Sequence, residues 1–319
     1  MRLLITGAAG FIGGAVYKEA AMNGEKWSLT RVVGVDWDES LCNNISNSID
    51  KKLMTQDSSM LCIDFASLKV LKSIESGDYD CVIHLAALPR VAYSVENPRK
   101  TDENNINKSV ALLEACLKSN TPMVFASSSS VYGGAKEMPT TENEQLSPVS
   151  PYALQKATFE KYLEIYKNLK NYKSISLRFF NVYGPGQDGS SAYSTVLSAW
   201  MYGIRNKKEI TLEGDGEQRR DFCYVGDVVN ACLLSVKKVN SVQGSFNIAC
   251  GANHSCNELL KYLGNKFGSE AIIVNRIPER VGDVKETLAD ISKASSLLGY
   301  VPHVTFWDGV DKTVDWWFC

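Results

Sequence analysis

A tyrosine and a lysine four residues apart are the pair in this sequence best suited to acid–base chemistry. They are Tyr152 and Lys156, and Ser150 followed by Pro151 marks the start of a helix that would carry both. Residues four apart lie on one helical face. An ammonium close to a phenol favours the phenolate and lowers its pKa from about 10, which would make Tyr152 a base for a substrate hydroxyl. The same spacing is also common in helices with an ordinary surface Tyr and Lys.

Four consecutive serines, Ser127 to Ser130, would assist such a base. They follow the apolar segment Met123–Ala126, which is typical of a strand. The run would therefore lie at the carboxyl edge of a parallel sheet, where hydroxyls can hydrogen-bond a reacting oxygen and help a proton to pass. The alternative is a polar loop without a catalytic role.

The start of the chain predicts a binding site for a dinucleotide. The apolar segment Arg2–Thr6 leads into Gly7, Gly10 and Gly13, and a helical pattern follows at once. Glycines at these positions let the backbone approach a pyrophosphate, to which the helix N-terminus presents N–H groups. The next strand ends in Asp36, whose carboxylate would meet the ribose hydroxyls of the adenosine half. Glycine turns also occur for purely structural reasons, but strand, turn, helix and acid in this order favour the dinucleotide.

Alternating strand-like and helix-like segments predict the framework that positions these residues. We expect an α/β fold, a doubly wound parallel sheet of the Rossmann type with ligands at the carboxyl ends of its strands. Residues 1–180 would form the dinucleotide-binding domain, to which 227–250 return, while 181–226 and 251–319 would form a smaller α/β region that binds substrate. The other predicted strands are Met60–Asp64, Asp80–Leu85 and Pro122–Ala126, and the other predicted helices are Ser67–Glu75 and Glu103–Lys118.

Composition argues against several other classes of protein. The 319 residues are 45% hydrophobic with a formal net charge of −2, and the 34 basic residues form no stripe that would indicate a nucleic-acid surface. No apolar run approaches the ~18 residues that span a bilayer. A strand at the first residue is not the pattern of a signal peptide. Nine cysteines without a Cys-x-x-Cys pair, and only three histidines, argue against a metal site. We therefore expect a cytoplasmic protein with free thiols.

Six motifs occur in the order typical of one enzyme superfamily. They are Thr6-Gly7-x-x-Gly10-x-x-Gly13, His84-Leu-Ala-Ala87, Ser128-x-x-Val-Tyr-Gly133, Tyr152-x-x-x-Lys156, Arg178-Phe-Phe-Asn-Val-Tyr-Gly184 and Gly214-Asp-Gly-Glu-Gln-Arg-Arg-Asp-Phe222. With them the chain resembles, over nearly its whole length, the extended short-chain dehydrogenase/reductase superfamily. More narrowly, it is similar to the nucleotide-sugar epimerases of that superfamily, among them the UDP-glucose and UDP-N-acetylglucosamine 4-epimerases.

The resemblance implies a tightly bound NAD that is regenerated in each turnover. Asp36 favours NAD over NADP, because a carboxylate repels a 2′-phosphate. Asp64 would meet the adenine, and Lys156 would bridge the nicotinamide ribose. The residues implied to hold NAD are Gly7, Gly10, Phe11, Ile12, Gly13, Asp36, Asp64, Phe65, Leu85, Ala86, Ala87, Asn105, Ser127, Tyr152, Lys156 and Phe179.

The resemblance also implies which residues act on a UDP-sugar. Tyr152 is the implied base, Ser128 its hydroxyl partner and Lys156 the third catalytic residue. Arg220 and Arg280 suit a diphosphate, because guanidinium groups form bidentate charge-assisted bonds. The alternative for each is a surface arginine that is solvated or paired with an acid. The implied substrate contacts are Ser128, Ser129, Ser130, Tyr152, Asn181, Arg220, Arg280, Asp283 and Thr287, and no metal is implied.

The family shares the oxidation of sugar carbon 4 to a ketone, and its members differ in the following step. Dehydratases carry an Asp-Glu pair directly after the catalytic hydroxyl, and UDP-glucuronate decarboxylases carry a Glu. The chain has Ser129 and Ser130 at those positions, which cannot do that acid–base work. Return of hydride to the opposite face, and hence 4-epimerisation, is the implied outcome. An oxidoreductase, dehydratase or decarboxylase, or a non-catalytic NAD-binding regulator, is the alternative.

Two positions bear on the choice of sugar. Where UDP-glucuronate 4-epimerases usually have an arginine that would face a 6-carboxylate, the chain has Ala92, although Arg90 lies nearby. Thr287 stands where a bulky Tyr commonly occurs in epimerases restricted to non-acetylated sugars. We therefore expect interconversion of UDP-glucose and UDP-galactose, of UDP-N-acetylglucosamine and UDP-N-acetylgalactosamine, or of both, with UDP-glucuronate as the alternative. The resemblance further implies a homodimer, in which the helices around Glu103–Lys118 and Pro151–Lys170 form a four-helix bundle.

Overall fold

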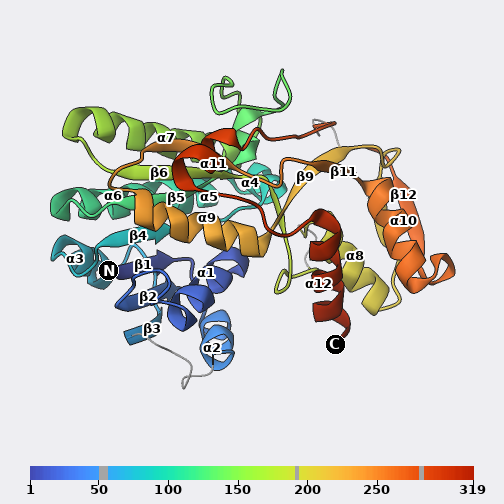
Figure 1. Ribbon diagram of the computed structural model, residues 1–319, viewed down its shortest axis with the longest axis horizontal. Helices are drawn as coiled ribbons and strands as arrows, with labels where there is room; N and C mark the ends of the chain where they lie inside the picture. Colours follow the sequence, from blue (N-terminus) through green and yellow to red (C-terminus); the bar gives the residue numbers. More distant parts are fainter. Residues whose placement is uncertain (50–56, 191–193, 280–283) are drawn as a thin grey trace.

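The central feature of the fold is a seven-stranded parallel sheet (Figure 1). The computed structural model describes residues 1–49, 57–190, 194–279 and 284–319. The order across the sheet is β10-β6-β5-β4-β1-β2-β3, which confirms the predicted doubly wound topology, because the order reverses between the neighbouring strands β1 and β4. Its strands are β1 (Arg2–Thr6), β2 (Arg31–Asp36), β3 (Asp57–Cys62), β4 (Cys81–His84), β5 (Met123–Ser128), β6 (Ser174–Phe179) and β10 (Gly244–Ile248).

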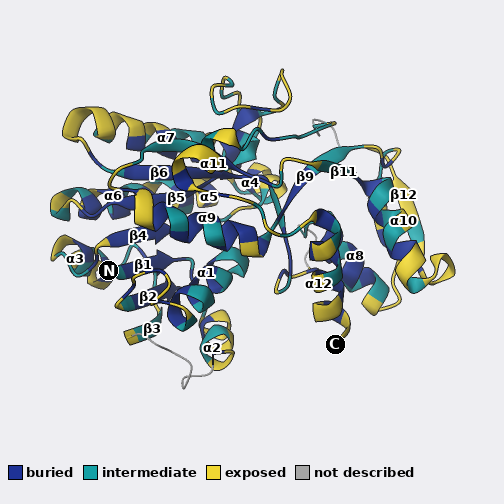
Figure 2. Ribbon diagram, in the orientation of Figure 1, coloured by how far each residue is buried: buried dark blue, intermediate teal, exposed yellow. Residues whose placement is uncertain are grey.

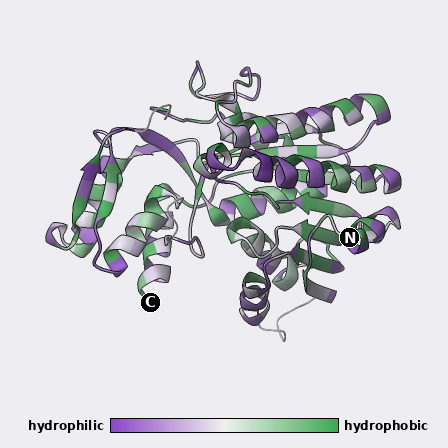
Figure 3. Ribbon diagram, turned by 180° about the vertical axis from the view of Figure 1, so that it is seen from behind, coloured by the Kyte–Doolittle hydropathy of each residue, from purple (hydrophilic) through white to green (hydrophobic). Residues whose placement is uncertain are grey.

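Helices cover both faces of this sheet, and the strands are apolar for that reason. Along β1, Leu3 and Ile5 belong to the core on one face and Leu4 to the core on the other. Figures 2 and 3 show buried, hydrophobic strands between helices whose outer faces are exposed. One face carries α1 (Phe11–Met22), α9 (Val225–Lys238) and α11 (Ser292–Leu298), and the other carries α3 (Leu68–Glu75), α6 (Lys108–Ser119) and α7 (Pro151–Lys170).

A smaller part of the molecule lies beside the carboxyl ends of the sheet (Figure 1). Its own core includes Trp200, Leu259 and Trp317. The three-stranded sheet consists of β7 (Asn181–Tyr183), β9 (Arg219–Tyr224) and β11 (Asn253–Ser255), and the two-stranded sheet of β8 (Ile210–Glu213) and β12 (Val274–Ile277). The helices are α8 (Val196–Arg205), α10 (Cys256–Phe267) and α12 (Phe306–Phe318).

The remaining elements show where local structure departs from the sequence-based expectation. The strand expected at Met60–Asp64 ends two residues earlier, at Cys62, so Asp64 lies in the following loop. The helix expected over Glu103–Lys118 begins with a π-helical turn, η1 (Glu103–Asn107). The short elements are α2 (Glu39–Asn47), α4 (Val91–Glu96), α5 (Pro98–Asp102), η2 (Ser129–Tyr132) and η3 (Ser269–Ala271). Among the described helices, none is both long and apolar enough to cross a membrane.

Candidate active site

The glycine turn between β1 and α1 leaves no space for a side chain at Gly7 or Gly13. Gly7 has a φ of +69°, and a Cβ added to it would lie 2.6 Å from the backbone nitrogen of Ala86. A Cβ on Gly13 would lie 1.9 Å from the carbonyl oxygen of Gly7. Gly10 precedes the first helical residue and places no side chain over the N–H groups there. The turn therefore presents bare backbone donors and the positive end of a helix, which suit a phosphate.

Asp36 ends β2 directly beside this turn. Its carboxylate accepts hydrogen bonds from the backbone N–H groups of Ala9, at 3.0 Å, and Asp38, at 3.3 Å. These bonds hold the carboxylate at the carboxyl edge of the sheet, where a ribose diol would lie. The glycine turn and Asp36 together fit a dinucleotide. Phe11 and Ile12, at the start of α1, are half-buried at the same edge.

Asn105 lies in the π-helical turn and fixes the segment that follows β4. Its side chain accepts a hydrogen bond from the Leu88 backbone N–H at 2.8 Å and donates to the Leu88 carbonyl at 3.2 Å. It also donates to Gln155 Oε1 at 2.9 Å. Leu85, Ala86 and Ala87 are half-buried in this segment. The two hydrogen bonds with Leu88 show that Asn105 holds the segment in place. Gln155 was not predicted from the sequence as a site residue. Its position between Tyr152 and Lys156 on one helix was a signal from which it could have been found.

Asp64 and Phe65 follow β3 at the same edge. The Asp64 carboxylate forms an ion pair with Lys108 and accepts a hydrogen bond from the Ala66 backbone N–H at 2.9 Å. Phe65 is buried, with its ring centre 5.1 Å from that of His84. The two residues thus border the edge next to Asp36, and their contact with adenine stays a prediction.

Tyr152 and Lys156 lie on one face of α7, as their spacing predicts. The Lys156 Nζ lies 5.8 Å from the centre of the Tyr152 ring and donates a hydrogen bond to the Ala126 carbonyl at 2.7 Å. Burial raises the pKa of Tyr152 to about 12, against a hydrogen bond with Ser128 and the charge of Arg90, which lower it. The expected pKa below 10 is therefore wrong for this structure, because burial penalises the phenolate more strongly than its neighbours favour it. Burial also lowers the pKa of Lys156 to about 7.

The serine run divides between the pocket and the interior. Ser128 Oγ accepts hydrogen bonds from the Ser130 backbone N–H, at 3.2 Å, and from Ser130 Oγ, at 2.9 Å. Ser127 turns away and donates to the buried carboxylate of Glu160, which also pairs with Arg178. Its hydroxyl is thus engaged inside the protein, and its contact with a cofactor stays a prediction.

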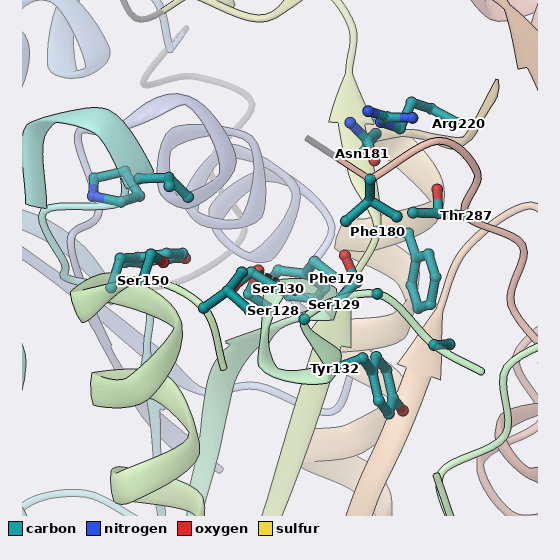
Figure 4. A pocket seen from close by; sticks show the side chains of 18 of the residues that line it. Ser128, Ser129, Ser130, Tyr132, Ser150, Phe179, Phe180, Asn181, Arg220 and Thr287 are labelled. Carbon is teal, nitrogen blue, oxygen red and sulfur yellow. Dashed lines mark hydrogen bonds between the residues drawn. The ribbon is translucent and has the colours of Figure 1, made fainter. Parts of the chain in front are cut away.

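One pocket collects the residues predicted to meet the substrate (Figure 4). Figure 4 shows Asn181 and Arg220 next to one another, with the serine run in another part of the same pocket. Of the residues that line it, those predicted from the sequence are Ser128, Ser129, Ser130, Tyr152, Phe179, Asn181, Arg220 and Thr287. Ser128 and Phe179 end β5 and β6, because parallel strands present their carboxyl ends at one edge, whereas Arg220 comes from β9 of the three-stranded sheet.

Backbone contacts fix the far wall of this pocket. Thr287 Oγ1 accepts a hydrogen bond from the backbone N–H of Asp221 at 3.1 Å. The buried Asp221 carboxylate in turn accepts the backbone N–H of Cys250, at 2.9 Å, and of Ala289, at 3.1 Å. Arg220 donates to the Lys285 carbonyl at 3.2 Å. Arg280 and Asp283, the other two predicted substrate contacts, lie outside the described residues.

Arg90 is a cation of the pocket. In the sequence it was noted only as an arginine near Ala92, the position at which UDP-glucuronate 4-epimerases usually have one. It lies just before α4, is half-buried and lines the pocket together with Tyr152 and Ser128. Burial lowers the pKa of its guanidinium, against the charges of Asp188 and Tyr152, which raise it. No hydrogen bond or ion pair joins the guanidinium to another residue within the described ranges. A half-buried cation without such a partner favours an anionic ligand.

The comparisons with known proteins match this geometry. The model of the NAD dependent epimerase/dehydratase family matches residues 3–249. A putative UDP-glucose 4-epimerase of Methanocaldococcus jannaschii is 31% identical over 98% of this chain and 97% of its own. Two solved structures have TM-scores of 0.86. One is a UDP-N-acetylglucosamine 4-epimerase from Methanobrevibacter ruminantium with UDP-N-acetylmuramic acid, 31% identical, covering 99% of this chain and 97% of that one. The other is a UDP-glucuronic acid 4-epimerase from Bacillus cereus with UDP-glucuronic acid and NAD, 30% identical, covering 99% of both chains.

The glycine turn, Asp36 and the Tyr/Lys helix stand at the sheet edge where a dinucleotide site belongs, and the family model spans all three. The chain therefore belongs to the NAD dependent epimerase/dehydratase family.

Proposed function

We propose that the protein is a UDP-sugar 4-epimerase that uses a bound NAD. The observation that carries this proposal is the pocket that Tyr152 and Ser128 line together, while Asn181 and Arg220 line another part of its wall. A base at one place and a cation beside an amide at another suit a sugar whose reacting hydroxyl and diphosphate lie at opposite ends. The names of the relatives support the same class of substrate.

Tyr152 and Ser128 move the proton in this proposal. When bound, NAD supplies the group that accepts and returns the hydride of sugar carbon 4. Tyr152 takes the proton of the 4-hydroxyl as the ketone forms and gives it back as the hydroxyl is restored. Ser128 hydrogen-bonds the same oxygen. Burial raises the pKa of Tyr152, and the charge of Arg90 opposes this rise and so favours the phenolate on which this role depends.

The pocket favours epimerisation over elimination of a group from the ketone. Ser129 and Ser130 are half-buried beside Ser128 and carry hydroxyls, which are poor general acids and bases at neutral pH. Nothing at these two positions can expel a 6-hydroxyl or a carboxylate. The ketone is then reduced again, and reduction on the opposite face inverts carbon 4.

Neutral hexoses are the first candidate sugars. Thr287 contributes a small side chain to the wall, and its hydroxyl is held by the Asp221 backbone. This small residue leaves space for an N-acetyl group at carbon 2. UDP-glucose with UDP-galactose, and UDP-N-acetylglucosamine with UDP-N-acetylgalactosamine, are therefore the pairs proposed.

UDP-glucuronate is the second candidate, favoured by Arg90. In a hexopyranose, carbon 4 lies across the ring from carbon 1, which carries the diphosphate, and next but one to carbon 6. A cation beside Tyr152 therefore faces the end of the sugar that bears a 6-carboxylate. A charge-assisted bond with that carboxylate would satisfy the guanidinium.

A substrate panel tests the function and the sugar together. The purified protein is incubated with UDP-glucose, UDP-N-acetylglucosamine and UDP-glucuronate without added NAD, and the 4-epimers are resolved by chromatography. The proposed function predicts turnover of at least one sugar, and turnover of none would refute it. If the substrate is UDP-glucuronate, Arg90→Met lowers kcat/KM roughly 10- to 100-fold, whereas Arg99→Met, at an exposed arginine on α5, does not. Equal turnover of glucuronate by the two variants would exclude the role of Arg90.

We also propose that the protein is a cytoplasmic homodimer. Leu154, Ile165 and Leu169 are exposed on α7, at spacings that place them on one helical face, as a helix bundle between two subunits requires. All nine cysteines are free thiols, which suits a reducing compartment.

A further inference from the structure

Two cysteines lie together behind the acid of the dinucleotide site. Cys42, on α2, donates its thiol to the carbonyl of Asp36 at 3.6 Å. Cys62, the last residue of β3, donates to the carbonyl of Trp37 at 3.7 Å. The two thiols also influence one another, because Cys62 is among the neighbours that raise the pKa of Cys42. The two sulfurs thus contact the carbonyls of two consecutive residues, the last residue of β2 and the one after it.

The strand pairing explains this arrangement. In the register of β2 and β3, Asp36 is the partner of Cys62, and the Ile63 backbone N–H donates to the Asp36 carbonyl at 2.7 Å. The carboxylate of the same Asp36 is held by Ala9 and faces the glycine turn. A covalent change at the two sulfurs therefore acts on the backbone that positions the Asp36 carboxylate.

The two sulfurs differ in access to solvent. Cys42 is 3% exposed, and burial raises the pKa of its thiol to about 12, with Asp36 and Cys62 adding to the effect. Cys62 is exposed. An exposed thiol against a buried one is the arrangement in which the first reacts with a reagent in solution and the second resolves the product.

We propose that Cys42 and Cys62 are a redox-modification site: they form a reversible disulfide with a small-molecule disulfide such as oxidised glutathione, and this bond weakens NAD binding. Cys62, as thiolate, attacks the reagent, forms a mixed disulfide and releases one glutathione thiolate. Cys42 attacks the sulfur of Cys62, and its proton passes to the second glutathione thiolate as that group leaves. The reagent is reduced to two thiols, and the two cysteines are oxidised to one disulfide.

The disulfide changes the ribose side of the site because the sulfurs must move. They have to approach one another to about 2.05 Å, which draws α2 towards β3 across the segment from Asp36 to Asp38. The carbonyls of Asp36 and Trp37 also lose their S–H donors. By linkage, NAD must oppose the oxidation as strongly as the oxidation opposes NAD.

Mass spectrometry and NAD titration test the proposal. The wild-type holoenzyme is equilibrated with oxidised glutathione, digested without reduction and mapped, and NAD affinity is measured by calorimetry before and after oxidation. We expect a Cys42–Cys62 linkage, NAD affinity lowered roughly five- to tenfold, recovery with dithiothreitol and slower oxidation when NAD is in excess. Cys319→Ala, at an exposed cysteine on the C-terminus, should behave as the wild type does.

Two single variants make the result decisive. Cys62→Ala should keep its NAD affinity under oxidation, and Cys42→Ala should stop at the mixed disulfide and gain the mass of one glutathione. A wild type that also stops at the mixed disulfide overturns the linkage. A linkage that leaves NAD affinity unchanged overturns its coupling to the cofactor.

Discussion

At the scale of single residues, the chemistry depends on the environment of Tyr152. The phenol is buried, and burial raises its pKa to about 12, while Ser128 and Arg90 act in the opposite direction. Lys156 is also buried, and its ammonium is held by the Ala126 carbonyl. A base of this kind needs positive charge close by to lose its proton near neutral pH. The pocket, more than the intrinsic acidity of tyrosine, decides whether the residue can work.

Replacement of Tyr152 by Phe should abolish turnover without loss of the fold. The change removes only the hydroxyl, so we expect kcat to fall on the order of 10²- to 10⁴-fold, while bound NAD and the thermal midpoint stay near wild type. The matched control is Tyr162→Phe, on the same helix but outside the pocket lining. Rates are measured with the sugar identified by the substrate panel. Activity of the Tyr152 variant within about threefold of the control would remove Tyr152 from its assigned role.

At the scale of elements, the β1–turn–α1 unit requires glycine at Gly13. Gly13→Ala would place a Cβ 1.9 Å from the Gly7 carbonyl oxygen, so the turn must open and the purified protein should carry no NAD. Gly14→Ala is the matched control one residue along the helix. Its added Cβ would meet the end of the flexible Ile45 side chain, at 2.7 Å, which can move aside. The ratio of absorbance at 260 and 280 nm after denaturation measures the NAD content, and equal contents in the two variants would contradict the account.

The buried end of β4 makes stability depend on pH. His84 is held between Thr6 and Ser109, and burial lowers its pKa from 6.5 to about 3. The unfolded chain therefore binds a proton below pH 6.5 that the folded chain does not. Stability from this group is complete above pH 6.5 and is lost as the pH falls towards 3, at about 1.4 kcal/mol per pH unit.

Urea unfolding at pH 7, 6 and 5 measures this slope. We expect His84→Gln to be less stable than the wild type at pH 7, because its side chain cannot reproduce both hydrogen bonds. The difference between the two proteins should shrink as the pH falls. Asp221, whose pKa is raised to about 6, makes a contribution to stability that changes with pH in the opposite direction. This contribution is the same in both proteins and so cancels in their difference. Parallel pH curves would show that His84 does not titrate in this way.

Much of the framework and part of the site could be predicted from the sequence, because both depend on local patterns. The apolar β1, the glycines after it and the Tyr/Lys spacing on α7 each lie within a few residues of one another. Arg90 could not be placed, since its nearness to Tyr152 depends on how α4 and α7 pack. The π-helical turn at Asn105 also depends on distant partners, Leu88 and Gln155. Contacts between distant segments leave no periodic signal in a single sequence.

At the scale of the whole molecule, the pocket lies where the parallel sheet meets the smaller part. Strands of the large sheet bring Tyr152's serine partners to it, and β7 and β9 bring Asn181 and Arg220. The buried Asp221 carboxylate joins segments at Cys250 and Ala289, so the two parts are tied together behind the pocket. A keto sugar held mainly by its nucleotide can rotate in such a site, as inversion at carbon 4 requires.

The proposed dimer predicts a particle with twice the 35.2 kDa of one chain. Leu169→Glu places a charge on the exposed face of α7 and should shift the sedimenting species towards the monomer. Leu297→Glu is the control, because Leu297 is similarly exposed on α11, away from the proposed bundle. A wild type that sediments as a monomer, or two variants with the same mass distribution, would refute this interface.

The most direct test of the central claim follows the hydrogen on sugar carbon 4. The sugar that the panel identifies is prepared with deuterium at that carbon and incubated with the purified protein in ordinary water without added NAD. We predict that the 4-epimer keeps its deuterium at carbon 4 and that no free NADH accumulates, since the hydride returns to the carbon from which it came. Loss of the deuterium to solvent, or its appearance in free NADH, would contradict a redox-neutral 4-epimerase.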